Sequence, residues 1–183
     1  MVIVCRHVIV LQTPCIWQSH CARALFSECM RNLAAAARLN ALVVDDDRSE
    51  LALLGLAIER SRHDIWLQTA NDGQRAIDYL LGRDVFSDRQ LHPLPDVVVL
   101  DLDMPLSGGF DFLDWRSASP AFSSLPIVVL SGWAYPGAIR AALAMGANAS
   151  ITKPAQAEDW NSIVDQIWNI ALACGRSPAT TGI

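Results

Sequence analysis

Residues 97–105 read Val-Val-Val-Leu-Asp-Leu-Asp-Met-Pro, and the organisation of the whole chain can be worked out from them. Four consecutive apolar residues, three of them β-branched, predict a strand that is buried on both faces, as in a parallel sheet. Pro105 cannot continue a central strand because it has no N–H to donate to a neighbouring strand. Asp101 is therefore expected at the carboxyl end of a buried strand, where open α/β sheets bind their ligands.

Four other segments are predicted as strands, at 41–44, 65–69, 127–130 and 149–152. Helical spacing of apolar residues, together with capping residues, predicts a helix after every strand, at 48–60, 73–81, 110–116, 136–145 and 158 to about 170. A β-α unit repeated five times predicts one parallel sheet with helices on both faces. Right-handed crossovers place the carboxyl ends of all five strands at one edge of the sheet, which we call the rim.

The composition indicates a globular chain of about one domain. The sequence has 183 residues, of which 52% are hydrophobic and 18% charged, and its formal net charge is -5 at pH 7. This balance argues against non-specific binding of nucleic acid, which needs a basic surface. The five cysteines contain no C-x-x-C pair, so free thiols in a reducing, cytoplasmic compartment are expected. No apolar run approaches the ~20 residues that cross a bilayer, and we expect no membrane partner.

The two ends of the chain differ from its middle. Residues 1–39 are predicted to be an N-terminal extension, either disordered or lying upstream of a true start at Met30. A signal peptide is less well supported, because the apolar run from Val8 ends early at Thr13 and Pro14. Residues 40–173 are predicted to form the folded domain and residues 174–183 a flexible tail.

Polar side chains that suit one another are predicted to meet at the rim. Asp45 and Asp46 follow the strand at 41–44, and Asp101, Ser131 and Lys153 follow or end three other strands. Each of these residues alone is common as a helix cap or a solvated side chain, but their joint arrival at one edge is much less common by chance. Crowded carboxylates repel one another, and Mg²⁺ relieves this repulsion with the oxygen ligands that it prefers. The metal, the ammonium and the hydroxyl would together neutralise and bind a transferred phosphoryl group.

The block at 41–170 resembles the receiver domain of two-component response regulators. The resemblance rests on the acidic pair, on L-D-L-D-M-P with Gly109, on V-V-L-S and on G-A-N-A-S-I-T-K-P. The spacings agree as well, with thirty residues from Asp101 to Ser131 and twenty-two more to Lys153. The connection D-R-Q-L-H-P-L-P-D also resembles the phytochrome-partner subgroup of single-domain regulators. The resemblance implies a flavodoxin-like, doubly wound, five-stranded parallel sheet.

The resemblance also implies the chemistry of the site. Asp101 would accept a phosphoryl group from the phosphohistidine of a sensor histidine kinase or of a phosphotransfer protein. Asp45, Asp46, Asp101 and the backbone carbonyl of Asp103 would hold Mg²⁺. Ser131 would be the hydroxyl that moves toward the phosphoryl group, and Lys153 its ion-pair partner, followed by a cis peptide bond to Pro154.

The implied output is signalling rather than turnover of a substrate. The protein would catalyse only its own phosphorylation and dephosphorylation, and would act by docking on a downstream protein target, with a homodimer as a further option. Three residues are expected to modulate this behaviour. Ser150 stands where the family usually has Tyr or Phe, and that ring moves with the switch hydroxyl. Asp103 and Trp133 would border the phosphoryl group, and we expect Trp133 to shield it from water.

Two other functions compete with this interpretation. D-L-D at 101–103 also resembles the D-x-D motif of haloacid-dehalogenase-like phosphatases, in which Asp101 would be the nucleophile and Asp103 the general acid/base. In those enzymes the acidic metal pair follows the lysine, whereas Asp45 and Asp46 precede it here. The second alternative is a pseudo-receiver that binds proteins without being phosphorylated, but the predicted site has every group that phosphoryl transfer needs. The segment after Gly175 is too short for a DNA-binding domain, so a transcription factor is not expected.

Overall fold

The computed structural model describes residues 4–5, 8–9, 38–105, 108–132 and 136–174. The chain divides into two compact units, Met1–Ala37 and Arg38–Ile183. In the first unit, β1 (Val4–Cys5) pairs antiparallel with β2 (Val8–Ile9). Met30, the alternative start considered above, lies outside the described residues.

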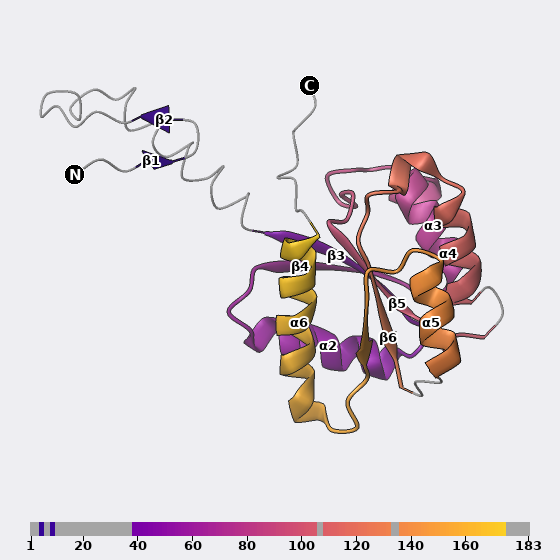
Figure 1. Ribbon diagram of the computed structural model, residues 1–183. Coiled ribbons are helices and arrows are strands. Elements are labelled where there is room, and N and C mark those ends of the chain that lie inside the picture. The colour runs from indigo at the N-terminus through magenta and orange to yellow at the C-terminus, as the bar shows by residue number, and fades with distance from the viewer. Residues whose placement is uncertain (1–3, 6–7, 10–37, 106–107, 133–135, 175–183) are drawn as a thin grey trace, which may run out of the picture. The chain divides into compact units, whose positions relative to one another are not determined.

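The second unit is built on one parallel sheet (Figure 1). Its strands are β3 (Leu39–Val44), β4 (Ile65–Ala70), β5 (Val97–Asp101), β6 (Ile127–Ser131) and β7 (Ala149–Thr152). They lie in the order β4-β3-β5-β6-β7, and every residue of β5 and β6 is buried. Numbered from the first strand of the sheet, this order is that of the flavodoxin-like fold, which confirms the predicted class. The first strand begins at Leu39, two residues earlier than the apolar pattern predicts.

Five helices cover the sheet, as the repeated β-α pattern predicts. They are α2 (Arg48–Arg60), α3 (Gly73–Leu81), α4 (Gly109–Ser117), α5 (Pro136–Ala144) and α6 (Trp160–Ala173), with single turns of 3₁₀-helix at η1 (Asp84–Phe86), η2 (Pro120–Phe122) and η3 (Ala157–Asp159). The helices α2 and α6 lie on one face of the sheet, and α3, α4 and α5 lie on the other (Figure 1). No helix among the described residues has the length and apolar character needed to cross a membrane.

The strands separate two hydrophobic cores, because successive side chains point to opposite faces of a sheet. In β3, Leu42 and Val44 pack into the core beneath α3 and α4, while Ala41 and Val43 pack into the core beneath α2 and α6. Both sets of side chains are at most 2% exposed. Burial on two sides explains why the central strands read as continuous apolar runs without alternation.

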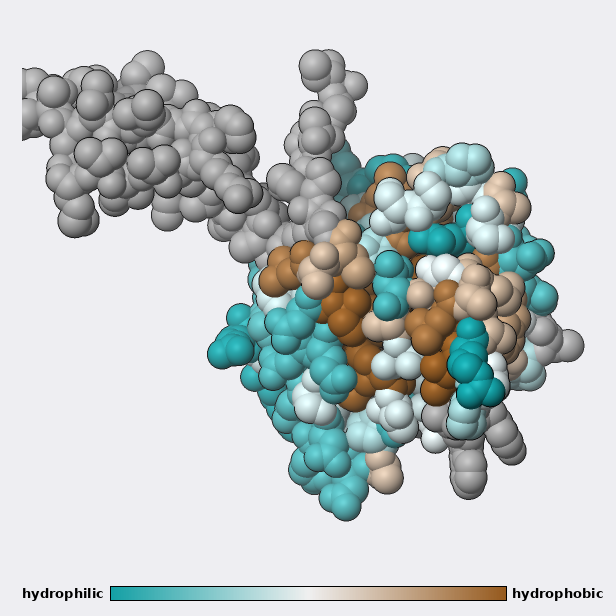
Figure 2. All heavy atoms as spheres, in the orientation of Figure 1, coloured by the Kyte–Doolittle hydropathy of each residue, from teal (hydrophilic) through white to brown (hydrophobic). Residues whose placement is uncertain are grey.

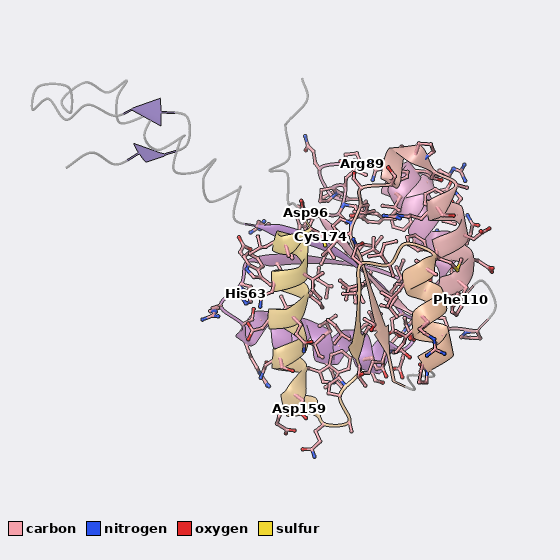
Figure 3. The ribbon with its side chains drawn as sticks, in the orientation of Figure 1. His63, Arg89, Asp96, Phe110, Asp159 and Cys174 are labelled. Carbon is pink, nitrogen blue, oxygen red and sulfur yellow. The ribbon has the colours of Figure 1, made fainter. Side chains whose placement is uncertain are left out.

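The long connection between α3 and β5 is anchored to the fold more firmly than its polar sequence predicts. The guanidinium of Arg89 donates to the backbone carbonyls of Tyr79 and Leu80 at 2.9 and 2.8 Å, at the end of α3 (Figure 3). The hydroxyl of Tyr79 donates to the carbonyl of Pro93 at 2.7 Å, and Phe86 is buried beside it. Arg89 thus gives a donor to the carbonyl of Leu80 at the helix end and a second donor to the carbonyl of Tyr79, which also accepts from the N–H of Gly82.

Candidate functional site

The ends of four strands bring the predicted site residues together. Asp101 and Ser131 are the last residues of β5 and β6, and Asp45 and Lys153 directly follow β3 and β7. The N–H of Lys153 donates to the carbonyl of Ser131 at 2.9 Å, which continues the pairing of the two strands past their ends. The sheet itself therefore holds these residues at the rim.

A buried ion cluster occupies the centre of this rim. The ammonium of Lys153 lies 3.0 Å from Oδ2 of Asp45 and 3.0 Å from Oδ2 of Asp101, and it also pairs with the carboxylate of Glu50. The side chains of Asp45, Asp101 and Lys153 are 3%, 5% and 8% exposed. Lys153 is the only lysine of the sequence. One cation thus serves three carboxylates, and the cluster carries an excess of negative charge.

Burial and ion pairing raise the pKa values of the three buried groups. Burial raises the pKa of Asp101 and of Asp45, although backbone N–H groups and Lys153 partly oppose this shift. Burial alone would lower the pKa of Lys153, but its contacts with Glu50, Asp101 and Asp45 outweigh burial and raise that pKa. The ammonium is therefore held charged, and the carboxylates are held in an environment that disfavours their charge.

Backbone N–H groups fix the orientation of both buried carboxylates. Oδ1 of Asp101 accepts from the N–H of Asp103 at 3.0 Å, and Oδ1 of Asp45 accepts from the N–H of Asp47 at 2.8 Å. Asp47 also caps α2, because its side chain accepts from the N–H groups of Ser49 and Glu50. Each buried carboxylate thus has one oxygen on the backbone and the other on Lys153.

Gly109 allows α4, the helix after β5, to pack closely against Asp101. A Cβ atom at Gly109 would lie 2.5 Å from the backbone oxygen of Asp101 and 3.0 Å from a methyl group of Leu102. The first of these neighbours is backbone and cannot rotate away. Glycine is therefore required here for close approach, which gives a structural reason for its place in the motif.

The carboxylates of Asp45, Asp46 and Asp101 offer ligand atoms that all lie within 4.8 Å of one another. Asp46 is exposed, whereas the other two are buried. Three carboxylate oxygens with room for water on one side form a donor set that suits Mg²⁺. The backbone carbonyl of Asp103 stays a predicted fourth ligand.

The hydroxyl of Ser131, the predicted switch residue, has a partner that the sequence did not indicate. Oγ of Ser131 donates to Oδ2 of Asp103 at 3.2 Å, and the N–H of Gly132 donates to the same oxygen at 3.3 Å. Ser150 lies on β7 opposite Val129 and is exposed. Trp133 lies outside the described residues, so its shielding role stays a prediction.

One expectation about this site is wrong. Among the described residues there is no cis peptide bond, so the bond between Lys153 and Pro154 is trans rather than cis. The trans form is the lower in energy by about 0.5–1 kcal/mol for a bond that precedes proline. With this trans bond the ammonium of Lys153 already reaches Asp45 and Asp101.

Glu50 is the functional candidate that the sequence analysis missed. It lies in the first turn of α2, and its side chain is 29% exposed. The sequence held a signal, because Glu50 follows the cap residue Asp47 by three residues, an acidic position typical of the first turn of a helix. Its contact with Lys153 depends on how α2 packs against α6 and the sheet, which local spacing does not reveal.

Comparisons with known proteins agree on one family. A family model described as the response regulator receiver domain matches residues 41–165. The probable methanogenesis regulatory protein FilR2 of Methanothrix harundinacea is 30% identical over 142 residues, which cover 75% of this chain and 86% of FilR2. The sensory/regulatory protein RpfC of Xanthomonas campestris is 28% identical, but the match covers only 19% of its length and 83% of this chain.

A solved structure extends this agreement to three dimensions. The phosphorylated cyanobacterial phytochrome response regulator RcpA superposes with a TM-score of 0.68 at 26% identity. The superposition covers 78% of this chain and 100% of that chain. The likeness to a phytochrome response regulator agrees with the subgroup that the long connection indicates.

Proposed function

This chain belongs to the response regulator receiver family, and from that premise we propose that Asp101 accepts a phosphoryl group from the phosphohistidine of a sensor histidine kinase or a histidine phosphotransfer protein. The observation that carries the proposal is the environment of the Asp101 carboxylate. It ends a fully buried strand, is oriented by a backbone N–H, and shares the ammonium of Lys153 with Asp45. We propose that the unit Arg38–Ile183 contains this whole function.

The transfer step needs few groups. An oxygen of Asp101 attacks the phosphorus, the bond from phosphorus to the donor nitrogen breaks, and its electron pair leaves with the imidazole. Lys153 lies against the attacking carboxylate of Asp101 and neutralises charge on the transferred oxygens, while Ser131 supplies a hydroxyl donor. Asp45 positions Lys153 through the ion pair at 3.0 Å.

We propose Mg²⁺ as the cofactor, held by Asp45, Asp46, Asp101 and the backbone carbonyl of Asp103. The excess of carboxylates over cations in the cluster supports this assignment, because a divalent ion would relieve their repulsion. When bound, Mg²⁺ neutralises charge that develops on the phosphoryl oxygens during transfer.

The proposed output surface consists of α5, β7 and α6, which follow the switch hydroxyl along the chain. Leu143 of α5 and Leu172 of α6 are 41% and 46% exposed, and Figure 2 shows hydrophobic residues gathered between these two helices. Movement of Ser131 toward a phosphoryl group would repack the elements after β6 and change this face. We propose that this surface docks on a downstream protein in the cytoplasm. Neither the phosphatase nor the pseudo-receiver alternative is favoured by the comparisons.

The decisive experiment measures covalent labelling of Asp101. Acetyl phosphate should add one phosphoryl group to the full chain only when Mg²⁺ is present, and Asp101→Asn should remove the added mass completely. Intact-mass spectrometry separates phosphorylation from acetylation of the single lysine. The matched control is Asp114→Asn, an exposed carboxylate on α4, which should label like the parent. Full labelling of Asp101→Asn, or multiple turnover of a phosphate monoester by the parent, would contradict the proposal.

A further inference from the structure

The side chain of Asp103 holds two hydrogen-bond donors at once. The hydroxyl of Ser131 and the N–H of Gly132 both point at the single oxygen Oδ2, at 3.2 and 3.3 Å. These partners lie 28 and 29 residues away along the chain, so the contact joins the end of β5 to the end of β6. Asp103 is exposed, whereas Ser131 is 4% exposed.

Two donors that converge on one point form a receptor for an anionic oxygen. A hydroxyl and a backbone N–H that converge on one point can both donate to the same negatively charged oxygen. The receptor lies beside Asp101 in the sheet, because Asp101 of β5 pairs with Leu130 of β6 and Ser131 directly follows Leu130. An oxygen of a phosphoryl group on Asp101 would require donors of this kind at this end of the sheet.

We propose that Asp103 is a positioning residue whose carboxylate occupies this receptor in the unphosphorylated protein and is displaced when Asp101 is phosphorylated. The proposal rests on the proposed function of Asp101. While the carboxylate of Asp103 accepts from Ser131 and Gly132, these two donors are unavailable to the phosphoryl group. The hydrogen bonds to Asp103 therefore compete with phosphorylation of Asp101. A protein that must first release an internal ligand binds an external one more weakly, in proportion to the free fraction.

The exposure of Asp103 makes this displacement feasible. Its carboxylate reaches the receptor from the solvent side, so it can leave into water without disturbing the cores. Asp45 and Asp101 cannot do the same, because they are buried and paired with Lys153. The competition therefore acts through one side chain, which substitutions can remove in steps.

Two substitutions separate occupation of the receptor from simple charge repulsion. Asp103→Asn removes the charge but keeps an acceptor oxygen, whereas Asp103→Ala removes both. The probe is fluoroberyllate, a non-covalent analogue of the phosphoryl group, titrated into the full chain at saturating Mg²⁺. We expect the dissociation constant to fall about threefold in Asp103→Asn and about tenfold in Asp103→Ala, because only alanine frees both donors. Equal affinity in the two variants would show that charge alone acts and would overturn the proposal.

A second measurement tests the receptor without any phosphoryl group. In metal-free, ¹⁵N-labelled protein, the amide proton of Gly132 should shift upfield and exchange faster in Asp103→Ala, with a smaller change in Asp103→Asn. The matched control is Asp46→Asn, which removes a carboxylate of the same rim that makes no hydrogen bond to Gly132 among the described residues. An unchanged Gly132 amide in Asp103→Ala would overturn the proposal, as would an equal change in Asp46→Asn.

The coupling between Asp103 and the switch hydroxyl gives a third readout. In a Ser131→Ala background the effect of Asp103→Ala on fluoroberyllate affinity should shrink, since one of the two contested donors is already gone. Full retention of the effect would contradict a role through Ser131. If the parent takes up no phosphate and binds no fluoroberyllate, the proposed function fails, and the Gly132 amide alone then decides whether Asp103 occupies the receptor.

Discussion

The buried and the exposed carboxylates of the rim behave as two different kinds of group. Asp45 and Asp101 are buried, oriented by backbone N–H groups and fastened to Lys153. Asp46 and Asp103 are exposed, and neither contacts the ammonium among the described residues. The buried pair therefore sets the energetics of the site, while the exposed pair can move.

The largest expected effect is a loss of stability when the cation of the buried cluster is removed. Lys153→Met removes the cation that Asp45, Asp101 and Glu50 share, and we expect it to lower the free energy of unfolding by about 3 kcal/mol without Mg²⁺. Urea unfolding at pH 7 in EDTA measures this change. Asp46→Asn, on the exposed side, should change the free energy by no more than about 0.5 kcal/mol. Similar small effects of both substitutions would remove the distinction between the two pairs.

The next effect concerns the backbone support of the buried acceptor. Gly109→Ala would place a methyl group 2.5 Å from the carbonyl oxygen of Asp101, and such overpacking should cost about 2 kcal/mol and slow labelling. The matched control is Gly137→Ala on α5, where a Cβ would meet nothing within 4 Å. Alanine favours a helix over glycine, so this control should be neutral or slightly stabilising. Equal loss of stability in the two variants would point to a general effect of losing glycine.

The lifetime of the phosphorylated state is predicted to depend on Trp133, which lies outside the described residues. We expect Trp133→Ala to shorten that lifetime about tenfold, a change of ~1.4 kcal/mol in the barrier, because the indole is predicted to shield the phosphorus from water. A decay time course of purified phosphoprotein in Mg²⁺, parent against variant, tests this directly. Unchanged or slower decay would mean that the indole does not cover the approach of water.

The smallest expected effect is a difference in pH dependence between Asp101 and Asp47. Burial raises the pKa of Asp101 above its ordinary 3.8, so the folded state holds this proton more tightly than the unfolded chain. Its stabilising contribution is complete below pH 3.8 and is lost as the pH rises through the raised pKa. Without Mg²⁺, the parent should therefore lose stability relative to Asp101→Asn as the pH rises from 3 toward 7. The change is modest because Lys153 opposes the cost of burial.

Asp47 provides the control of opposite sign. Hydrogen bonds from the N–H groups of Ser49 and Glu50 lower the pKa of this exposed cap, although burial opposes them. Its contribution is present above pH 3.8 and is lost as the pH falls, so the parent should gain stability relative to Asp47→Asn as the pH rises. Urea unfolding of the three proteins over a pH series in EDTA measures both slopes. If the stability difference between parent and variant changed with pH in the same direction for Asp101→Asn and Asp47→Asn, burial would not distinguish the two carboxylates.

Local patterns in the sequence were sufficient to predict the architecture and most of the candidate site. Continuous apolar runs identify strands buried on both faces, and a repeated β-α order leaves few topologies for them. Parallel strands bring their carboxyl ends to one edge, so Asp101, Ser131 and Lys153 could be placed together before any distance was known. This success has a simple physical cause, since the position of a strand end depends on backbone hydrogen bonds and hardly on side-chain packing.

Contacts between side chains from different elements depended on the folded chain. Glu50 reaches Lys153 only because α2 packs beside the sheet, and Asp103 meets Ser131 only through the turn after β5. The anchoring of the long connection by Arg89 is of the same kind. Sequence spacing specifies which residues share a strand end or a helix face, but helix packing and loop geometry select the partner of each charged group. Helix packing and loop geometry depend on many residues that are far apart in the sequence, so no short stretch of the chain determines these contacts.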